Sequence, residues 1–420
     1  MIPDTVFIVF AFLLGSCIGS FLNVVVWRVP RGKSIFWPAS ACPKCHHHLS
    51  AGDNIPVFGW ILLGGKCRYC KEPISARYPI IEAITGLLFV LYYVCFFMLQ
   101  LGPTTINVGD FGIIEHTFLS SIQSDYAIYG VYMLLISGLL ASSLIDAELY
   151  IIPIEIPWTV ALIAFVAFAV MDRPADAPGM LSAGRVGGLM AIGGAGGLLI
   201  SNLLLWLKVL PQSFAKGDPL LEFEREAMEK ELRDQNAEQA EFARLPPVAT
   251  KSEIRREMLK EAWFVAIPLV LAIATPLVVL RLGMGRAAWI GAITPGSWLS
   301  GLLGSMLGAM VAGLSIWITR IGATLVLGRV GMGQGDTHLM IAIGAVMGAG
   351  PAVAVFFLAP FCGIAVGVYK WLTKGTHELP YGPYLSLAAG VVAIFYRYIG
   401  DYFALPVLMI RDMAAQWFGR

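Results

Sequence analysis

The chain has 420 residues, of which 57% are hydrophobic and 14% are charged, and its formal net charge at pH 7 is +1. A soluble globular protein carries about 25% charged residues, so this composition excludes that class. The small net charge gives no indication of nucleic-acid binding, and we expect no nucleic-acid partner.

Apolar segments near the length needed to cross a bilayer recur along the chain. They predict ten candidate spans, at residues 6–27, 79–101, 127–145, 157–171, 186–208, 263–282, 298–319, 337–349, 352–370 and 384–400. We therefore expect an all-α polytopic integral membrane protein with about 8–10 transmembrane helices, embedded in a lipid bilayer. The first span lacks the basic region of a signal peptide, so we do not expect it to be cleaved.

The distribution of basic residues predicts the orientation of the chain. Segment 28–78 is rich in Lys and Arg, whereas segment 102–126 contains neither. The positive-inside rule then places segment 28–78 in the cytoplasm and the N-terminus outside. Counting spans forward places segment 209–262 in the cytoplasm as well, in agreement with its many basic residues.

The spans and loops divide the chain into five parts. They are a first transmembrane helix (1–27), a cytoplasmic four-cysteine zinc domain (28–78), transmembrane helices carrying an acidic residue (79–208), a charged helical cytoplasmic insertion (209–262) and transmembrane helices with a GxGD motif (263–420).

Segment 28–78 contains two Cys-x2-Cys pairs, Cys42 with Cys45 and Cys67 with Cys70. Two residues between thiolates let one tight turn aim both sulfurs at one ion, and two such turns complete a tetrahedral zinc site. Two disulfides are the alternative, although a reducing cytoplasm disfavours them. Because so short a segment buries little apolar surface, we expect a structural zinc ion to stabilise it. One of the three histidines that follow Cys45 could replace a ligand, but four cysteines already close the site, so we expect the histidines to be surface residues.

Two acidic residues lie at the ends of apolar segments. Asp146 ends the third span, and Asp336 follows the seventh, behind the glycines of "GMGQGDTH". An even number of spans separates them, so both lie on the same side of the membrane and could meet. Two close carboxylates suit general acid–base chemistry, in which one activates water and the other protonates a leaving amine. The alternative is that both acids simply cap helix ends.

These residues resemble one family, the bacterial prepilin peptidases, which are bifunctional GxGD-type membrane aspartyl proteases of type IV pilus and type II secretion systems. Four stretches in order carry the resemblance: "GSFLNVVVWRVP" (19–30), the segment from "ACPKC" to "ISARYPIIE" (41–82), "IDAELYIIP" (145–153) and "GMGQGDTHLM" (331–340).

The resemblance implies that Asp146 and Asp336 are the catalytic dyad of an aspartic endopeptidase. Such an enzyme cleaves the leader peptide of type IV prepilins and pseudopilins at the cytoplasmic face of the bacterial inner membrane. It then methylates the new N-terminus with S-adenosyl-L-methionine as methyl donor. Gly65, in "LLGGKC", matches a glycine associated with methylation and is the implied cofactor-binding residue. Assembly proteins of pili or type II secretion are further implied partners.

Three features depart from the family's pattern. Ile154 stands where the family usually has an aspartate, and His338 stands where it often has lysine. Histidine is charged only at mildly acidic pH, so we expect the pH profile to depend on His338. The third departure is an insertion over residues 186–282, predicted as a glycine-rich span, a charged cytoplasmic stretch and a further span. We expect its glycines to allow close helix packing, and residues 216–262 to form a solvated helix interrupted at Pro246-Pro247.

Without the resemblance, two classes of protein fit these features. An intramembrane protease needs its acids close together, whereas a proton- or ion-coupled transporter uses them as a relay near mid-bilayer. Asp336 follows three nearby glycines and has a partner acid at the same depth, and this arrangement favours the protease. A zinc-stapled membrane scaffold without activity is a third interpretation, supported only by Ile154 and the insertion.

Overall fold

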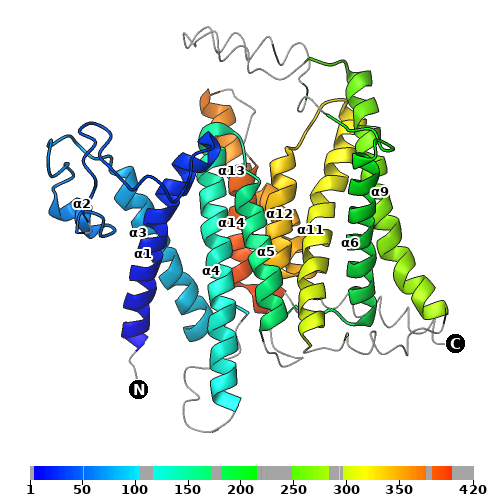
Figure 1. Ribbon diagram of the computed structural model, residues 1–420, viewed down its shortest axis with the longest axis horizontal. Helices are drawn as coiled ribbons and strands as arrows, with labels where there is room; N and C mark the ends of the chain where they lie inside the picture. The colour runs from blue at the N-terminus through cyan, green and yellow to red at the C-terminus, as the bar shows by residue number, and fades with distance from the viewer. Residues whose placement is uncertain are drawn as a thin grey trace.

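A computed structural model describes residues 4–50, 52–103, 117–171, 181–214, 248–282, 297–374 and 381–399, together with the single residues 219, 225 and 293. For residues 117–124 and 365–374 the description is of the backbone. The described part is a bundle of helices without strands (Figure 1). Six of these helices are long and apolar enough to cross a membrane, which makes the chain a multi-pass membrane protein.

Ten helices form the bundle. In chain order they are α1 (Asp4–Arg28), α3 (Arg77–Tyr93), α4 (Thr117–Leu149), α5 (Glu155–Val170), α6 (Arg185–Trp206), α9 (Lys251–Arg281), α11 (Trp298–Leu327), α12 (Gln334–Met347), α13 (Ala349–Lys374) and α14 (Gly382–Ile394). Three short elements complete the description: the 3-10 helix η1 (Val29–Arg31), α2 (Phe58–Leu62) and the π-helix η2 (Val94–Met98). Every predicted span overlaps one of the ten helices, so the predicted all-α membrane fold is confirmed.

The helices lie side by side in three groups (Figure 1). Helices α1 and α3 pack together at one edge of the bundle, and α6 and α9 pack together at the other. Between them, α12 contacts α4, α5, α11, α13 and α14, and most of its side chains are buried. The segment that carries Asp336 therefore begins the most enclosed helix of the bundle.

Glycines allow the closest of these helix contacts. A β-carbon added at Gly19 of α1 would lie 2.7 Å from the Cα of Glu82 in α3. In the insertion, a β-carbon at Gly197 of α6 would lie 2.3 Å from the Cα of Pro268 in α9. Small residues let helix backbones approach in lipid, where packing rather than the hydrophobic effect drives association. The expected close packing of the glycine-rich span is therefore confirmed.

Helix α9 joins the end of the predicted solvated helix to the span that follows it. It begins at Lys251, so residues 251–262 are helical, as expected, and continue without a break into the span predicted from residue 263. Thr250 and Glu253 form a reciprocal capping box there, which supplies acceptors for the first amides. Hydropathy marks where a helix enters lipid, whereas capping marks where it begins. Most of the predicted solvated helix lies outside the described residues.

Candidate functional site

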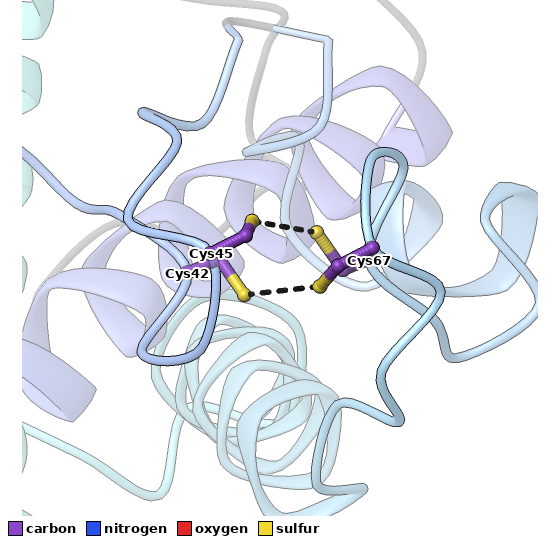
Figure 2. A group of neighbouring side chains, drawn as sticks. Cys42, Cys45 and Cys67 are labelled. Carbon is purple, nitrogen blue, oxygen red and sulfur yellow. Dashed lines mark hydrogen bonds between the residues drawn. The ribbon is translucent and has the colours of Figure 1, made fainter.

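The four cysteines of segment 28–78 lie in two knuckles of the same geometry. The amide of Cys42 donates to the carbonyl of His47 at 3.0 Å, and the amide of Cys67 donates to the carbonyl of Glu72 at 2.8 Å. The residue after the second cysteine of each knuckle has a positive φ, 58° in one and 62° in the other. Because the two turns are alike, they direct two pairs of sulfur atoms toward one another (Figure 2).

The spacing of the sulfur atoms fits a tetrahedral metal site. The Sγ atoms of Cys42 and Cys70 are 3.8 Å apart, those of Cys45 and Cys67 are 3.9 Å apart, and all four lie within 4.8 Å of one another. Zinc at about 2.3 Å from each sulfur places the sulfurs about 3.8 Å apart at the corners of a tetrahedron. All four cysteines are free rather than joined in disulfides. The cluster could therefore hold a metal ion, as the spacing of the cysteines predicts.

Backbone amides prepare part of this cluster to carry negative charge. The amide of Cys45 is the main group that lowers the pKa of Cys42, to about 6. The amide of Cys70 likewise lowers the pKa of Cys67. For Cys70 itself, the amide of Glu72 lowers the pKa, but burial and the neighbouring thiols outweigh it and raise the pKa to about 12. A cation at the centre would favour the thiolate form of all four sulfurs.

The three histidines after Cys45 lie outside this cluster. All three are exposed, and the ring of His47 stacks on Tyr69 with the ring centroids 4.4 Å apart. The prediction that they are surface residues is confirmed.

Gly65 lies at the start of the second knuckle, against an aromatic ring. Its φ is 69°, and a β-carbon there would lie 2.8 Å from Cζ2 of Trp60. The indole of Trp60 donates to the carbonyl of Ile74 at 3.0 Å, and the amide of Ile74 donates to the carbonyl of Gly65 at 2.7 Å. Packing against Trp60 and the left-handed backbone therefore both require glycine at this position.

A strained turn joins the cysteine module (residues 28–78) to the membrane helices. Val57 has φ 63° and ψ −56°, and the amide of Phe58 donates to the carbonyl of Pro56, which together define a γ-turn with positive φ. Such turns are rare, above all at a β-branched residue. The amide of Val57 donates to the Glu82 carboxylate of α3 at 2.7 Å, and Glu82 is buried. This bond fixes the module to α3, beside which Figure 1 shows it.

The two acids singled out in the sequence both lie buried at helix ends. Asp146, in the last turn of α4, is 6% exposed, and Asp336, in the first turn of α12, is 7% exposed. The amide of Gly382, the first residue of α14, donates to Oδ2 of Asp146 at 3.2 Å. Each carboxylate therefore lies at the N-terminus of a helix, where the helix dipole favours negative charge.

Ile152 connects the surroundings of the two acids. A β-carbon at Gly335, next to Asp336, would lie 2.8 Å from the Cβ of Ile152. A β-carbon at Gly382, which binds Asp146, would lie 3.0 Å from Cδ1 of the same isoleucine. A neighbour of Asp336 and the hydrogen-bond partner of Asp146 thus pack against the same side chain. Both acids therefore lie near Ile152 and each lies at a helix N-terminus, so the structure is compatible with both interpretations of the acids.

The two single-residue departures from the family pattern lie nearby. Ile154 precedes α5 with its side chain about half exposed, and this side chain caps no amide of that helix. The indole of Trp158, on α5, donates to Nδ1 of His338 at 3.3 Å. Because Nδ1 accepts this bond, the imidazole in this arrangement is neutral with its proton on Nε2.

A buried arginine next to the acids was not singled out in the sequence. Arg320, on α11, is fully buried, and its Nη1 donates to the carbonyl of Met332 in the loop before α12. The signal that could have identified it is a charged residue at the edge of the apolar span 298–319.

Comparisons with known proteins bear out the resemblance for part of the chain. Residues 13–96 match a family model described as the bacterial peptidase A24 N-terminal domain. A curated protein named prepilin leader peptidase/N-methyltransferase from Myxococcus xanthus is 55% identical over 83 residues, which is 20% of this chain and 25% of that protein. A protein of the same name from Klebsiella pneumoniae is 47% identical over 88 residues, which is 20% of this chain and 39% of that protein. Another from Pseudomonas aeruginosa is 33% identical over 170 residues, which is 35% of this chain and 49% of that protein.

The chain thus spans between a quarter and a half of the length of these curated relatives. No solved structure matches it. The family match covers α1, the cysteine module and α3, whereas Asp146 and Asp336 lie outside it.

Proposed function

We propose that this chain is a prepilin leader peptidase and N-methyltransferase whose peptidase dyad is Asp146 and Asp336. The observation that carries the proposal is the convergence of the two buried carboxylates around Ile152, at the N-termini of α12 and α14. Acids at helix ends favour hydrolysis at the membrane surface over a proton relay, which needs acids near mid-bilayer. The matched N-terminal family domain supports the same assignment.

The dyad performs general acid–base hydrolysis without a covalent intermediate. One carboxylate takes a proton from water while the resulting hydroxide attacks the scissile carbonyl carbon. The other, protonated, carboxyl gives its proton to the amide nitrogen as the carbon–nitrogen bond breaks. Ile152 packs against Gly335 and Gly382, the glycines that adjoin the two acids. The products are the free leader and a mature N-terminus, which is the substrate for methylation.

An apolar groove supplies a place for the prepilin's hydrophobic helix. A cavity of about 640 Å³ lies between α1, α3, α4 and α5, and its lining extends along α1 from Phe7 and on to Val29 in η1. At 1.5 Å per residue this is about 33 Å, the length of a helix that crosses a bilayer. Glu155 lines the same groove, next to the loop after Asp146. An acidic group there suits a substrate whose basic leader precedes its apolar helix.

The cysteine module holds a structural zinc ion in this proposal. Cys42, Cys45, Cys67 and Cys70 would supply four thiolates and leave no open position for a substrate. A bound zinc ion would cross-link the two knuckles. Gly65 is accounted for by its contact with Trp60, so its methyl-donor role rests on the resemblance alone. The basic module and the acids lie at the cytoplasmic face of a bacterial inner membrane.

Cleavage of a prepilin by the purified chain in detergent tests the proposal. Asp146→Asn and Asp336→Asn should each abolish cleavage and leave zinc content and thermal stability near wild type. Glu148→Gln is the matched control, because Glu148 lies on the same turn of α4 but pairs with Arg77 at the surface. Cleavage that persists in either aspartate variant would reject the dyad. A labelled methyl donor in the same reaction reports methylation separately.

A further inference from the structure

The inserted helix α9 forms a buried ion pair with α11. Oε1 of Glu261 lies 3.3 Å from Nε of Arg320, and the indole of Trp317 donates to the same oxygen. Glu261 is 3% exposed and Arg320 is not exposed at all. A charge buried in a membrane protein is costly unless it is paired, and such groups commonly serve function.

The guanidinium of Arg320 reaches from this pair to the loop that carries the second acid. Its Nη1 donates to the carbonyl of Met332, four residues before Asp336. The ring of Phe214, in the segment after α6, lies 5.7 Å from the guanidinium carbon. Residues of the insertion therefore contact Arg320 through Glu261 and Phe214, while Arg320 contacts the loop.

The loop between α11 and α12 contains glycines, which give its backbone more conformational freedom than other residues would. Gly328 ends α11 with φ 68°, and a β-carbon at Gly331 would meet nothing within 4 Å. A glycine-containing loop loses more conformational entropy on ordering than other sequences. A fixed donor to the Met332 carbonyl restricts this loop and hence the position at which α12 begins.

We propose that Glu261 and Arg320 are a positioning pair that holds the loop before Asp336 in place, so that the α6–α9 insertion helps to set the geometry of the dyad. The inference rests on the proposed function for its catalytic consequence. It assigns the insertion a role within the membrane protein itself. Arg320 acts through Met332 and α12, and Glu261 acts through Arg320.

The test combines a double replacement with two measurements. In Glu261→Leu/Arg320→Met, an apolar pair replaces the ion pair, a change that commonly preserves stability. The donor to the Met332 carbonyl is nevertheless lost. We expect the melting temperature to be retained, kcat for prepilin cleavage to fall about 10- to 100-fold with KM nearly unchanged, and hydrogen exchange over residues 328–336 to rise. Glu261→Gln, which keeps an acceptor for Arg320, should lose less activity than the double variant.

Arg255→Gln provides the matched control. Arg255 also extends from α9 to α11, where it donates to the carbonyl of Val326 at 3.0 Å, but it is exposed and does not reach the loop. This variant should retain wild-type kcat and exchange. The proposal is overturned if the double variant is stable and both cleaves and exchanges like wild type. If the wild-type chain does not cleave prepilin, the proposed function fails, while the exchange measurement still decides whether the pair orders the loop.

Discussion

Gly335 and Ile152 are in contact across the two segments that carry the acids: a β-carbon at Gly335 would lie 2.8 Å from the Cβ of Ile152. The glycine before Asp336 is thus required by a neighbouring side chain. This contact sets how near the start of α12 can come to the loop that follows Asp146.

Gly335→Ala should therefore displace α12 from that loop. A shift of about 1 Å in a catalytic group can cost about 100-fold in rate, so we expect kcat for prepilin cleavage to fall to that extent. Gly331→Ala is the control, since its β-carbon would meet nothing within 4 Å. Equal activities of the two variants would show that the Ile152 contact does not constrain the dyad.

A leucine at Gly130 should obstruct the apolar groove. Gly130 lines the groove on α4, and a β-carbon there would enter open space, so Gly130→Leu extends into the groove without disturbing the helix. We expect KM for prepilin in the cleavage assay to rise about tenfold, which is the loss expected when substrate binding alone is weakened. Gly322→Leu, on α11 and equally open, should leave KM unchanged. An unchanged KM in Gly130→Leu would exclude the groove as the substrate site.

Metal analysis of the purified chain should find one zinc ion per chain. Cys67→Ser should abolish zinc binding and unfold the cysteine module, because a segment of this size depends on its metal for stability. Cys17→Ser, which changes a cysteine of α1 outside the cluster, should retain zinc. Full zinc content in Cys67→Ser would contradict the four-thiolate site.

The dependence of prepilin cleavage on pH, at mildly acidic pH, should be set in part by His338. As the pH falls, protonation of Nδ1 removes the acceptor of the Trp158 indole, so wild-type activity should decline at mildly acidic pH. His338→Lys is charged throughout this range and should lack that decline. Trp158→Phe keeps the histidine but removes the donor, and should also change the acidic limb. Superimposable profiles of wild type and His338→Lys would contradict this role.

Gly65→Ala should destabilise the cysteine module through two effects. Alanine at positive φ costs about 1–2 kcal/mol relative to glycine, and its methyl group would also meet the ring of Trp60. Gly64→Ala isolates the backbone cost, because Gly64 has φ 62° but no neighbour within 4 Å. The melting temperature of Gly65→Ala should therefore be lower than that of Gly64→Ala. Loss of methylation by Gly65→Ala without loss of stability would instead favour a direct contact with the methyl donor.

The sequence predicted those features that depend on local pattern. Apolar length located every helix of the bundle, and the spacing of Cys42, Cys45, Cys67 and Cys70 predicted one cluster. These signals are local for two reasons. A membrane span must form its backbone hydrogen bonds within its own helix, and a Cys-x2-Cys turn positions both of its sulfur atoms without help from the rest of the chain.

Features that join distant segments could not be predicted in this way. Glu261 and Arg320 are in different helices, and neither has a recognisable motif. The bond from Val57 to Glu82 depends on a strained turn that no residue preference favours. Three-dimensional packing decides each of these.

The bond between Val57 and Glu82 also has a mechanical consequence. It ties a rare turn outside the bilayer to a carboxylate held inside a membrane helix, and α1 packs closely against that same helix. A force applied to the cysteine module is then transmitted to both α3 and α1.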